Sequence, residues 1–412
     1  MRKALYFLFV FLAFIVATTL ISCEKILPTA PESNEVLAEP IADLSPSQLA
    51  LHIKGDEEFA RIFSEAEGLG PVFVQNSCES CHVGDGKGNP FNNLTRFGRY
   101  DTANMWDPLL AIGGPQIQHR AISNYKGEEL PPNVQSSQFI APNVTGLGYL
   151  GAVLDADILA MSDPFDSDND GISGVVQLVD KPDFLNPDPR YHTPQAGGKY
   201  IGRFGRKSSA IDLVQQTVGA YKQDMGITSD FDTQDPVNFQ DSRFADDNVP
   251  DPEIPAATLN KVVFYLQTLE APRRRNENVP SVIAGEAVFL KIGCESCHKS
   301  TLKTGQSEIA ALDQVEFHPY TDMLLHDMGA DLDDKYTEGV VETFEWRTMP
   351  LWGYGLQAES QGSQIYLLHD GRAKTLAEAI NFHGGEAAAS RDNYKALTPT
   401  EKQQLEVFLN SL

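Results

Sequence analysis

A five-residue sequence, C-E-S-C-H, occurs twice in this chain. It runs from Cys78 to His82 and again from Cys294 to His298, 216 positions further on (294 − 78). The two copies contain four of the five cysteines, and the fifth, Cys23, lies near the beginning of the sequence. No cysteine is left over for a disulfide framework, so the chemistry of the two C-x-x-C pairs decides what this chain folds around.

Two thiols followed at once by a histidine meet the requirements for covalent attachment of a c-type haem. The cysteines form thioethers with the haem vinyl groups, and the histidine ligates the iron from one face. The alternatives are zinc held by two C-x-x-C pairs, or two thioredoxin-like dithiols. Zinc does not require a histidine at the same offset in both copies, and neither pair lies in a βαβ pattern. We therefore predict two covalently bound haems c, attached through Cys78, Cys81, His82, Cys294, Cys297 and His298.

The repeated motif also predicts the organisation of the chain. Each half ends in a helix-like segment, with Tyr265 and Phe408 at matching places. The expected fold class is mainly α and loop-rich, with two cytochrome c-like haem domains. Prolines, arginines and asparagines between the halves suit an exposed linker. The predicted boundaries are 46–272 for the first domain, 273–280 for the linker and 281–412 for the second domain.

The first half is the longer one. Cys78 and Tyr265 are 187 positions apart (265 − 78), whereas Cys294 and Phe408 are 114 apart (408 − 294), so the first half carries about 73 additional residues. Phe73 and Phe289 each stand five positions before the first cysteine of their motif. We expect each aromatic ring to pack near the group that its cysteines hold.

Composition narrows the classes of partner. A chain of 412 residues with 42% hydrophobic residues can bury two modest cores. The formal charge is −25, and it becomes −27 when Arg2 and Lys3 are removed. Proteins that bind nucleic acid need a basic surface, so no nucleic-acid partner is expected. An acidic surface suits a basic protein donor of electrons.

The N-terminal segment resembles a bacterial lipoprotein signal. Arg2 and Lys3 precede an apolar run over 4–21, and small residues lead into Cys23, which would carry the lipid. The alternative is an uncleaved transmembrane anchor. Residues 1–22 are predicted as the signal peptide and 23–45 as a flexible tether. The protein is therefore expected to face the periplasm, anchored by lipid to a bacterial membrane, with Glu24 favouring the outer one.

An acidic stretch in the first half predicts a calcium loop. The sequence D-S-D-N-D-G at 166–171 repeats the opening of such a loop, with oxygens at positions one, three and five and a turn at six. Position twelve is Gln177 rather than glutamate, so Asp163 or Asp180 would have to complete the shell. The alternative is an Asx-turn without metal. The predicted ligands are the side chains of Asp166, Asp168 and Asp170 and the carbonyl of Ile172.

The C-terminal sequence L-L-H-D-G-R-A-K-T-L-A-E-A-I at 367–380 is similar to a signature of bacterial dihaem cytochrome c peroxidases. With G-R-F-G at 202–205, D-M-G-I-T at 224–228 and R-T-M-P-L-W-G at 347–353, it resembles the dihaem oxidoreductase (putative peroxidase) family, also labelled thiol oxidoreductase. The resemblance covers most of the chain after about residue 50. It implies a reactive haem at His82 and a relay haem at His298.

The resemblance implies an enzyme that reduces hydrogen peroxide to water with electrons from a periplasmic donor. Two other functions stay open on the same scaffold. One is a dihaem oxygenase that cleaves an organic substrate, or an enzyme that matures the cofactor of a partner protein. The other is an electron carrier without catalytic activity, in which both irons have six ligands.

The resemblance also suggests the second ligand of the relay iron. In the peroxidases this ligand lies about fourteen residues after the H-D-G histidine, which here is His383 (369 + 14). The sequence T-L-A-E at 375–378 predicts a capping box that begins a helix, and glycines at 384–385 permit its end. A surface histidine at a helix end is the alternative reading of His383. The competing ligands are Met328 and His326.

At the reactive haem the resemblance points to a glutamine and then a carboxylate. Gln215 or Gln216 followed by Asp224 lies at nearly the family's spacing, with aspartate in place of glutamate. A carboxylate near the iron can move protons during peroxide cleavage. The alternative is that Asp224 caps a turn. No histidine stands between His82 and His119, which favours an iron with an open sixth position.

One departure from the family concerns the position after G-R-F-G. Family members usually have tryptophan there, whereas this chain has Arg206. An aromatic residue between the haems must then come from elsewhere. The candidates are Trp352, Tyr354 and Phe204, with packing in the core as the alternative role.

Overall fold

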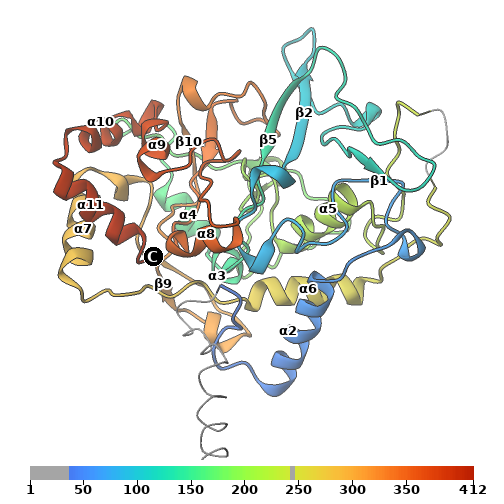
Figure 1. Cartoon of the computed structure of the whole chain (residues 1–412), viewed down its shortest axis with the longest axis horizontal. Helices are drawn as coiled ribbons and strands as arrows, with labels where there is room; N and C mark the ends of the chain where they lie inside the picture. The colour runs from blue at the N-terminus through green and yellow to red at the C-terminus, as the bar shows by residue number, and fades with distance from the viewer. Residues whose placement is uncertain (1–36, 242–245) are drawn as a thin grey trace, which may run out of the picture. The chain divides into compact units, whose positions relative to one another are not determined.

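The computed structural model describes residues 37–241 and 246–412 (Figure 1). The predicted signal peptide, Cys23 and most of the tether lie outside the described residues. Ten α-helices and eleven short strands occur in the described part of the chain. In those same residues, none of the helices is both long and apolar enough to cross a membrane.

Helices are the main regular elements, and loops connect them over long distances. The helices are α2 (Pro46–Phe59), α3 (Leu147–Gly151), α4 (Asp155–Met161), α5 (Leu213–Met225), α6 (Ala256–Thr268), α7 (Pro280–Lys291), α8 (Gln357–Ser360), α9 (Leu376–Asn381), α10 (Ala388–Ala396) and α11 (Pro399–Leu409). The helical, loop-rich character of the fold is therefore as expected from the sequence.

The strands form small antiparallel sheets that the sequence did not predict. They are β1 (Val72–Phe73), β2 (Leu94–Tyr100), β3 (Trp106–Asp107), β4 (Arg120–Ala121), β5 (Gln135–Phe139), β6 (Leu178–Val179), β7 (Tyr200–Ile201), β8 (Leu302–Lys303), β9 (Glu316–Phe317), β10 (Leu325–Asp327) and β11 (Glu345–Arg347). The largest sheet has the order β3-β2-β5, and the pairs are β1-β4, β6-β7, β8-β9 and β10-β11. In the largest sheet Leu94 pairs with Phe139 and Gly98 with Gln135.

Sequence signals explain the ends of several helices. Ser45 and Gln48 form a capping box at the start of α2, and Thr398 and Glu401 form another at the start of α11. At α9 the Thr375 side chain caps the helix, but the Glu378 carboxylate accepts from the backbone N–H of Lys374 rather than closing the expected box. His383 lies two residues beyond the end of this helix, directly after its C-cap Phe382.

The same helix crossing occurs in both halves of the chain. Helix α2 packs on α6, and α7 packs on α11. At the first crossing a Cβ at Gly55 would lie 2.6 Å from the Cβ of Tyr265, and at the second a Cβ at Gly285 would lie 2.6 Å from the Cβ of Phe408. Only glycine permits such a close approach of the two helices. The duplicated motif is thus accompanied by a duplicated helix pair.

The two aromatic residues that precede the motifs do not occupy matching elements. Phe289 lies in α7, whereas Phe73 lies in β1 and pairs with Arg120. Phe59 is the counterpart of Phe289, because each stands four residues after the crossing glycine and packs against the aromatic side chain of the opposite helix. The longer segment between α2 and its motif moves Phe73 out of the helix.

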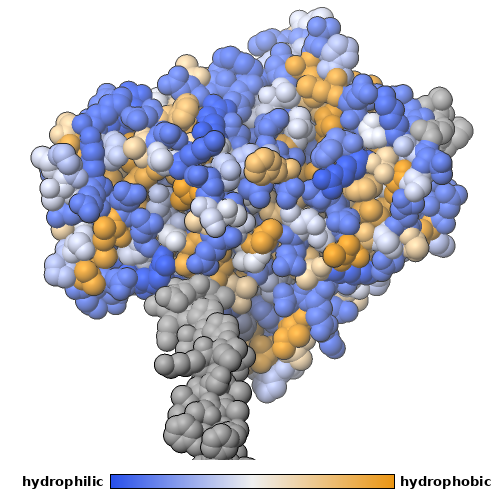
Figure 2. All heavy atoms as spheres, in the orientation of Figure 1, coloured by the Kyte–Doolittle hydropathy of each residue, from blue (hydrophilic) through white to orange (hydrophobic). Residues whose placement is uncertain are grey.

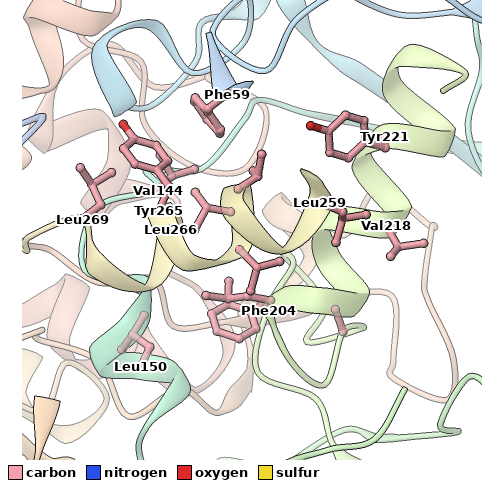
Figure 3. Close-up of a cluster of buried hydrophobic side chains, with 14 of the residues drawn as sticks. Phe59, Val144, Leu150, Phe204, Val218, Tyr221, Leu259, Tyr265, Leu266 and Leu269 are labelled. Atoms are coloured by element: carbon pink, nitrogen blue, oxygen red, sulfur yellow. The ribbon is translucent and has the colours of Figure 1, made fainter. Parts of the chain in front are cut away.

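Two large hydrophobic clusters lie beside the two helix pairs. The first contains Phe59, Phe204, Tyr221 and Tyr265 (Figure 3). The second contains Phe289, Tyr320, Tyr394 and Phe408. Trp352 and a few other residues of the second half pack into the first cluster, so the two cores interlock. The domain boundaries at 272 and 281 stay a prediction.

Hydrogen bonds from the C-terminal H-D-G region join the two halves. The backbone N–H of Ile140 donates to the carbonyl of His369 at 2.8 Å, and the Gln361 amide donates to the carbonyl of Gly88 at 2.7 Å. On the face in Figure 2, hydrophobic residues are scattered among hydrophilic ones. Interior hydrogen bonds and the shared hydrophobic cluster therefore hold the two halves together.

We expect the substitution Gly285→Ala to destabilise the fold by roughly 1–3 kcal/mol, because the added methyl group overpacks the crossing of α7 and α11. The matched control is Gly219→Ala in α5, where an added Cβ meets nothing within 4 Å. That substitution should be neutral or stabilise by roughly 0.5–1 kcal/mol. Denaturant unfolding of both variants checks the pair, and equal stability of the two would contradict the account of the crossing.

Candidate haem sites

A cavity lies against the first C-x-x-C-H motif. Cys78, Cys81 and His82 line it, and one face of helix α5 forms part of its wall. Residues three and four positions apart share a helix face, which is why these α5 residues come together. They are Leu213, Gln216, Thr217, Ala220, Tyr221, Asp224 and Met225.

The thiols of the first motif are buried, and burial raises the pKa of Cys78 and of Cys81 to about 12 each. Uncharged cysteine sulfurs, such as those of haem thioethers, suit these surroundings. Burial also lowers the pKa of His82 to about 4, so its imidazole is neutral and able to ligate iron. Of the histidines in the described residues, His82 alone lines this cavity.

A second cavity lies against the second motif and contains two well-oriented imidazoles. Nδ1 of His298 is 2.9 Å from the carbonyl oxygen of Tyr320, and Nδ1 of His383 is 2.8 Å from that of Ala379. A carbonyl can only accept, so Nδ1 carries the proton in both rings and Nε2 keeps its lone pair. Burial lowers the pKa of His298 to about 4 and that of His383 below its ordinary value.

The two competing ligands differ in their availability. Met328 lines the second cavity, as does His326. His326, however, uses both ring nitrogens, with Nε2 2.8 Å from Asp322 and Nδ1 2.6 Å from Glu386. Burial opposes its charge, but hydrogen bonds with Asp322, Cys297 and Glu386 outweigh burial and raise its pKa to about 12. A protonated imidazole has no lone pair for iron, so His326 is a poor ligand.

Three buried cations line both cavities and form the wall between them. They are Lys87, Arg206 and Arg347, whose exposed fractions are 7%, 7% and 6%. None of them forms a salt bridge with a described carboxylate. Burial lowers the pKa of Arg206 to about 9 and that of Arg347 to about 10, and it holds the pKa of Lys87 well below its usual value.

These cations contact uncharged groups only, so part of their positive charge is not balanced. Arg206 donates to the carbonyl of Ile140 at 2.7 Å and Arg347 to that of Gly205 at 2.9 Å. Nε of Arg206 and Nη1 of Arg347 have no hydrogen-bond partner. Buried unpaired charges are costly, so these side chains suit a bound anion. Haem carries two propionate carboxylates, and Lys87, Arg206 and Arg347 are the residues that would balance them in either cavity.

The aromatic candidates divide between the cavities. Trp352 and Phe204 line the first cavity and Tyr354 lines the second. Trp346, which the sequence did not single out, also lines the second cavity and stacks on His369 with ring centroids 3.7 Å apart and an interplanar angle of 10°. Its only sequence signal is its place directly before the R-T-M-P motif. The position after G-R-F-G is used for the cation wall instead of an aromatic residue.

The H-D-G motif forms a charged bracket beside the second cavity. Oδ2 of Asp334 lies 2.6 Å from Nε2 of His369, and Oδ1 accepts from Arg372 at 2.7 Å. Burial opposes ionisation of Asp334, but His369, Ser137 and Arg372 together hold its pKa well below the usual range. The bracket fixes the ring of His369 against Trp346. These contacts give His369 and Asp334 a structural role.

The glutamines and the carboxylate expected at the reactive haem do not all line the first cavity. Gln216 and Asp224 line the first cavity, whereas Gln215 does not and accepts from the backbone N–H of Ile211 at 2.8 Å. Asp224 accepts from the side-chain amide of Gln116 at 2.7 Å. Burial raises the pKa of Asp224, against the opposing effects of Gln116 and Arg96.

Two polar residues near Asp224 had no signal in the sequence. Arg96 of β2 lines the cavity and pairs with Glu338 at 3.5 Å. Gln116 does not line the cavity; it is buried behind Asp224 and also donates to the carbonyl of Gln223 at 3.0 Å, which fixes the amide that holds Asp224. Both residues come from the strand and loop region that follows the first motif, and the sequence did not predict the sheet in that region.

The acidic loop at 166–170 brings its carboxylates together. One oxygen from each of Asp166, Asp168 and Asp170 lies within 4.8 Å of the others. Gln177, at position twelve, donates instead to the carbonyls of Lys207 and Ser208, and Asp180 pairs with Lys199. Asp163 accepts from Ser167. The side chain of Ile172 lines the second cavity. The calcium ion itself stays a prediction.

The cavities, the repeated motifs and the cation wall together define a chain that holds two haems. The chain belongs to the family described as "Di-haem oxidoreductase, putative peroxidase", whose sequence model matches residues 22–95 and 115–412. The unmatched segment, 96–114, contains most of β2 and all of β3. The family assignment expected from the sequence is confirmed.

The remaining comparisons add little to the family match. None of the curated proteins with which the chain was compared matches it. Among solved structures, hydrazine synthase from Kuenenia stuttgartiensis, pressurised with 20 bar xenon, aligns with 16% identity over 94% of this chain and 98% of that one. The TM-score is 0.33.

The bracket around Asp334 predicts a pH-dependent stability. Because its folded pKa lies below that of the unfolded chain, its stabilisation is present above about pH 4 and is lost as the pH falls. We expect Asp334→Asn to cost roughly 1.5–3 kcal/mol at pH 7, and the difference from the parent protein to shrink as the pH falls from about 5 toward 2. Denaturant unfolding at several pH values measures this difference. A cost that does not change with pH would contradict the assignment; Asp392→Asn, in an exposed ion pair, is the control.

Proposed function

We propose that this protein is a dihaem c-type oxidoreductase that reduces hydrogen peroxide to water. The haem attached at His82 is the reactive centre, and the haem attached at His298, with His383 as second ligand, relays electrons to it. The observation that carries the proposal is the difference between the cavities. The second has two neutral imidazoles with free Nε2 atoms, and the first has one histidine and a buried carboxylate.

The haem at the first site supplies an iron that binds the peroxide and accepts electrons for its reduction. The overall reaction takes up two electrons and two protons for each peroxide and releases two waters. Cleavage of the O–O bond requires a proton to leave one peroxide oxygen and to reach the other, departing oxygen. Asp224 is the group in the cavity that suits this transfer, since a carboxylate with a raised pKa can both accept and return a proton.

The neighbours of Asp224 orient it for this role. Gln116 donates to Oδ1 at 2.7 Å, which fixes the carboxylate and leaves Oδ2 as the oxygen for proton transfer. Gln216 lies about two helical turns before Asp224 on the same face of α5 and supplies an amide to the cavity. Gln215 would then serve only to begin the helix. These assignments rest on position in the cavity and on chemistry together.

The relay role of the second site follows from its having protein ligands for both remaining positions of a haem iron. Two neutral imidazoles complete the coordination of an iron and leave no position for a substrate. Bis-histidine ligation lacks the methionine that raises reduction potential in related relays, so a donor of low potential suits this haem. The cation wall of Lys87, Arg206 and Arg347 would balance propionates of both haems and shorten the path between them.

The cellular setting belongs to the same proposal. The lipoprotein-like N-terminus supports lipid anchorage through Cys23, with the enzyme facing the periplasm, where its electron donor would also lie. The two cytochrome c-like domains at 46–272 and 281–412 would each hold one haem. A calcium ion at 166–170 would stiffen a loop that contacts the second cavity through Ile172.

The first test of the catalytic role is Asp224→Asn in the dihaem protein. We expect kcat/KM for hydrogen peroxide to fall by about 10²- to 10⁴-fold, because the amide cannot accept the proton. The visible and paramagnetic spectra of both haems should stay nearly unchanged. Asp224→Glu, which restores the family's residue, is the matched control and should keep most of the activity. Full activity in Asp224→Asn would clear this residue of a catalytic role.

In the parent enzyme, the same proton transfer predicts an acid limb in the pH profile of kcat/KM. Activity should fall as Asp224 becomes protonated, and since burial raises its pKa, the limb should lie above the pH at which an exposed aspartate titrates.

The relay ligand is tested by His383→Gly, read by electron paramagnetic resonance of the ferric protein. The parent should show one high-spin and one low-spin iron, and the variant should lose the low-spin signal. His318→Ala, at an exposed histidine that hydrogen-bonds with Thr301, is the control and should leave the spectrum unchanged. A persisting low-spin signal would assign the ligand to another residue such as Met328. Two low-spin irons in the parent would favour the electron carrier instead.

A further inference from the structure

A second group of carboxylates lies in the connection between helices α5 and α6, the yellow-green loop region of Figure 1. One oxygen from each of Asp235, Asp246 and Asp247 lies within 4.8 Å of the others, and the same holds for Asp235, Asp251 and Glu253. Asp235 belongs to both groups. This cluster is distinct from the acidic loop at 166–170 and from both cavities.

Several oxygens of the cluster have no partner. Asp247 is only 7% exposed, and its Oδ1 accepts from the backbone N–H of Val249 at 2.7 Å, but its Oδ2 makes no hydrogen bond. Oδ1 of Asp235 and Oε1 of Glu253 are also buried and unpartnered. A buried carboxylate oxygen without a donor is costly, so these atoms suit a bound cation or a proton.

Among the described residues, no cationic side chain pairs with the cluster. None of the five carboxylates forms a salt bridge in the described part of the chain, and Lys222, on the neighbouring helix, is paired with Asp232 at 3.0 Å. The cluster thus brings several carboxylates together with no described cation to balance their charge.

We propose that this cluster binds one calcium ion, with Asp235 as its central ligand. The available donors are all oxygens, which excludes a preference for zinc, a metal bound mainly through nitrogen and sulfur. Calcium accepts six to eight oxygens in irregular geometry, whereas magnesium demands a near-octahedral shell and keeps its waters. Carboxylates from separated segments form an irregular, anionic shell, which suits calcium.

The site is anchored on the side that faces the core. The Thr228 hydroxyl donates to Oδ1 of Asp251 at 2.6 Å, and the Thr228 backbone N–H donates to Oε2 of Glu253 at 2.5 Å. Glu253 also packs on Gly68, where a Cβ would lie 2.0 Å from its Cγ. These contacts hold Asp251 and Glu253 in place beside the end of α5.

The ion would fasten the chain that follows α5. Asp224 is the penultimate residue of that helix, and Thr228 stands four residues after it. A calcium ion would therefore stabilise the part of the fold that positions Asp224 at the first cavity. The binding site itself does not depend on which reaction the haems perform.

The test uses the intact dihaem protein after treatment with EDTA and gel filtration. Because 166–170 could also bind calcium, Asp168→Asn serves as the reference background. Three proteins are compared: the parent, Asp168→Asn, and the double variant Asp168→Asn with Asp235→Asn. Calcium chloride or magnesium chloride is titrated calorimetrically, bound calcium is counted by elemental analysis, and thermal unfolding is followed with and without calcium.

We expect Asp168→Asn to bind one calcium ion per chain and to melt at a higher temperature with calcium, and magnesium to bind at least 10-fold more weakly. The double variant should lose this binding by at least 10-fold. In EDTA it should be no less stable than Asp168→Asn, because asparagine removes a repelled buried charge. That last comparison shows that loss of binding is not loss of folding.

Three results would overturn the proposal. In the first, Asp168→Asn binds no calcium; a rise in its stability on acidification would then mean that protons, shared between carboxyl groups, satisfy the cluster. In the second, the double variant keeps the calcium response, which would place the ion elsewhere. Equal responses to calcium and magnesium that vanish in salt would likewise indicate a diffuse interaction with surface charge and not this site.

Discussion

The positive wall between the two cavities is the constraint on which the architecture depends. Lys87, Arg206 and Arg347 are buried, line both cavities, and form no salt bridge with a described carboxylate. Buried charges of this kind are costly without anions nearby. The wall would therefore suit groups that bring carboxylates of their own into the cavities. The hydrogen bonds that join the halves keep this arrangement in register.

Around the wall, the two sites use the same motif for different ends. In the second cavity, carbonyl oxygens of Tyr320 and Ala379 orient two imidazoles with their free nitrogens available. In the first, residues of helix α5 line the cavity, and His82 is the one histidine there among the described residues. Under the proposed function, a duplicated motif would give one iron with two protein ligands and one with an open position, according to what the rest of the chain brings to each cavity.

Features that depend on a few neighbouring residues could be predicted from the sequence. The C-x-x-C-H motifs, the family and the capping of α11 are encoded within a few residues, and the spacing from His369 to His383 singled out an imidazole that does line the second cavity. Gln215 and Gln216 could not be separated by spacing. They point about 100° apart on a helix, and only packing decides which one faces the cavity.

Other features have no local signal at all. The wall unites positions 87, 206 and 347, and Arg206 was visible only as a departure from the family. The network around His326 depends on Asp322 and Glu386, which are 64 positions apart (386 − 322). Likewise, Gln116 reaches Asp224 across 108 positions. Contacts of this kind are set by the tertiary fold, which a single sequence does not specify by spacing.

The glycine crossings explain how the two halves can differ in length with little effect on the free energy of folding. Gly55 meets Tyr265 across 210 positions (265 − 55), and Gly285 meets Phe408 across 123 (408 − 285). The entropy of closing a loop grows only with the logarithm of its length, so the longer closure costs about 0.5 kcal/mol more. A single helix crossing can therefore support a large insertion, and the extra loops of the first half are where the acidic segments of this protein lie.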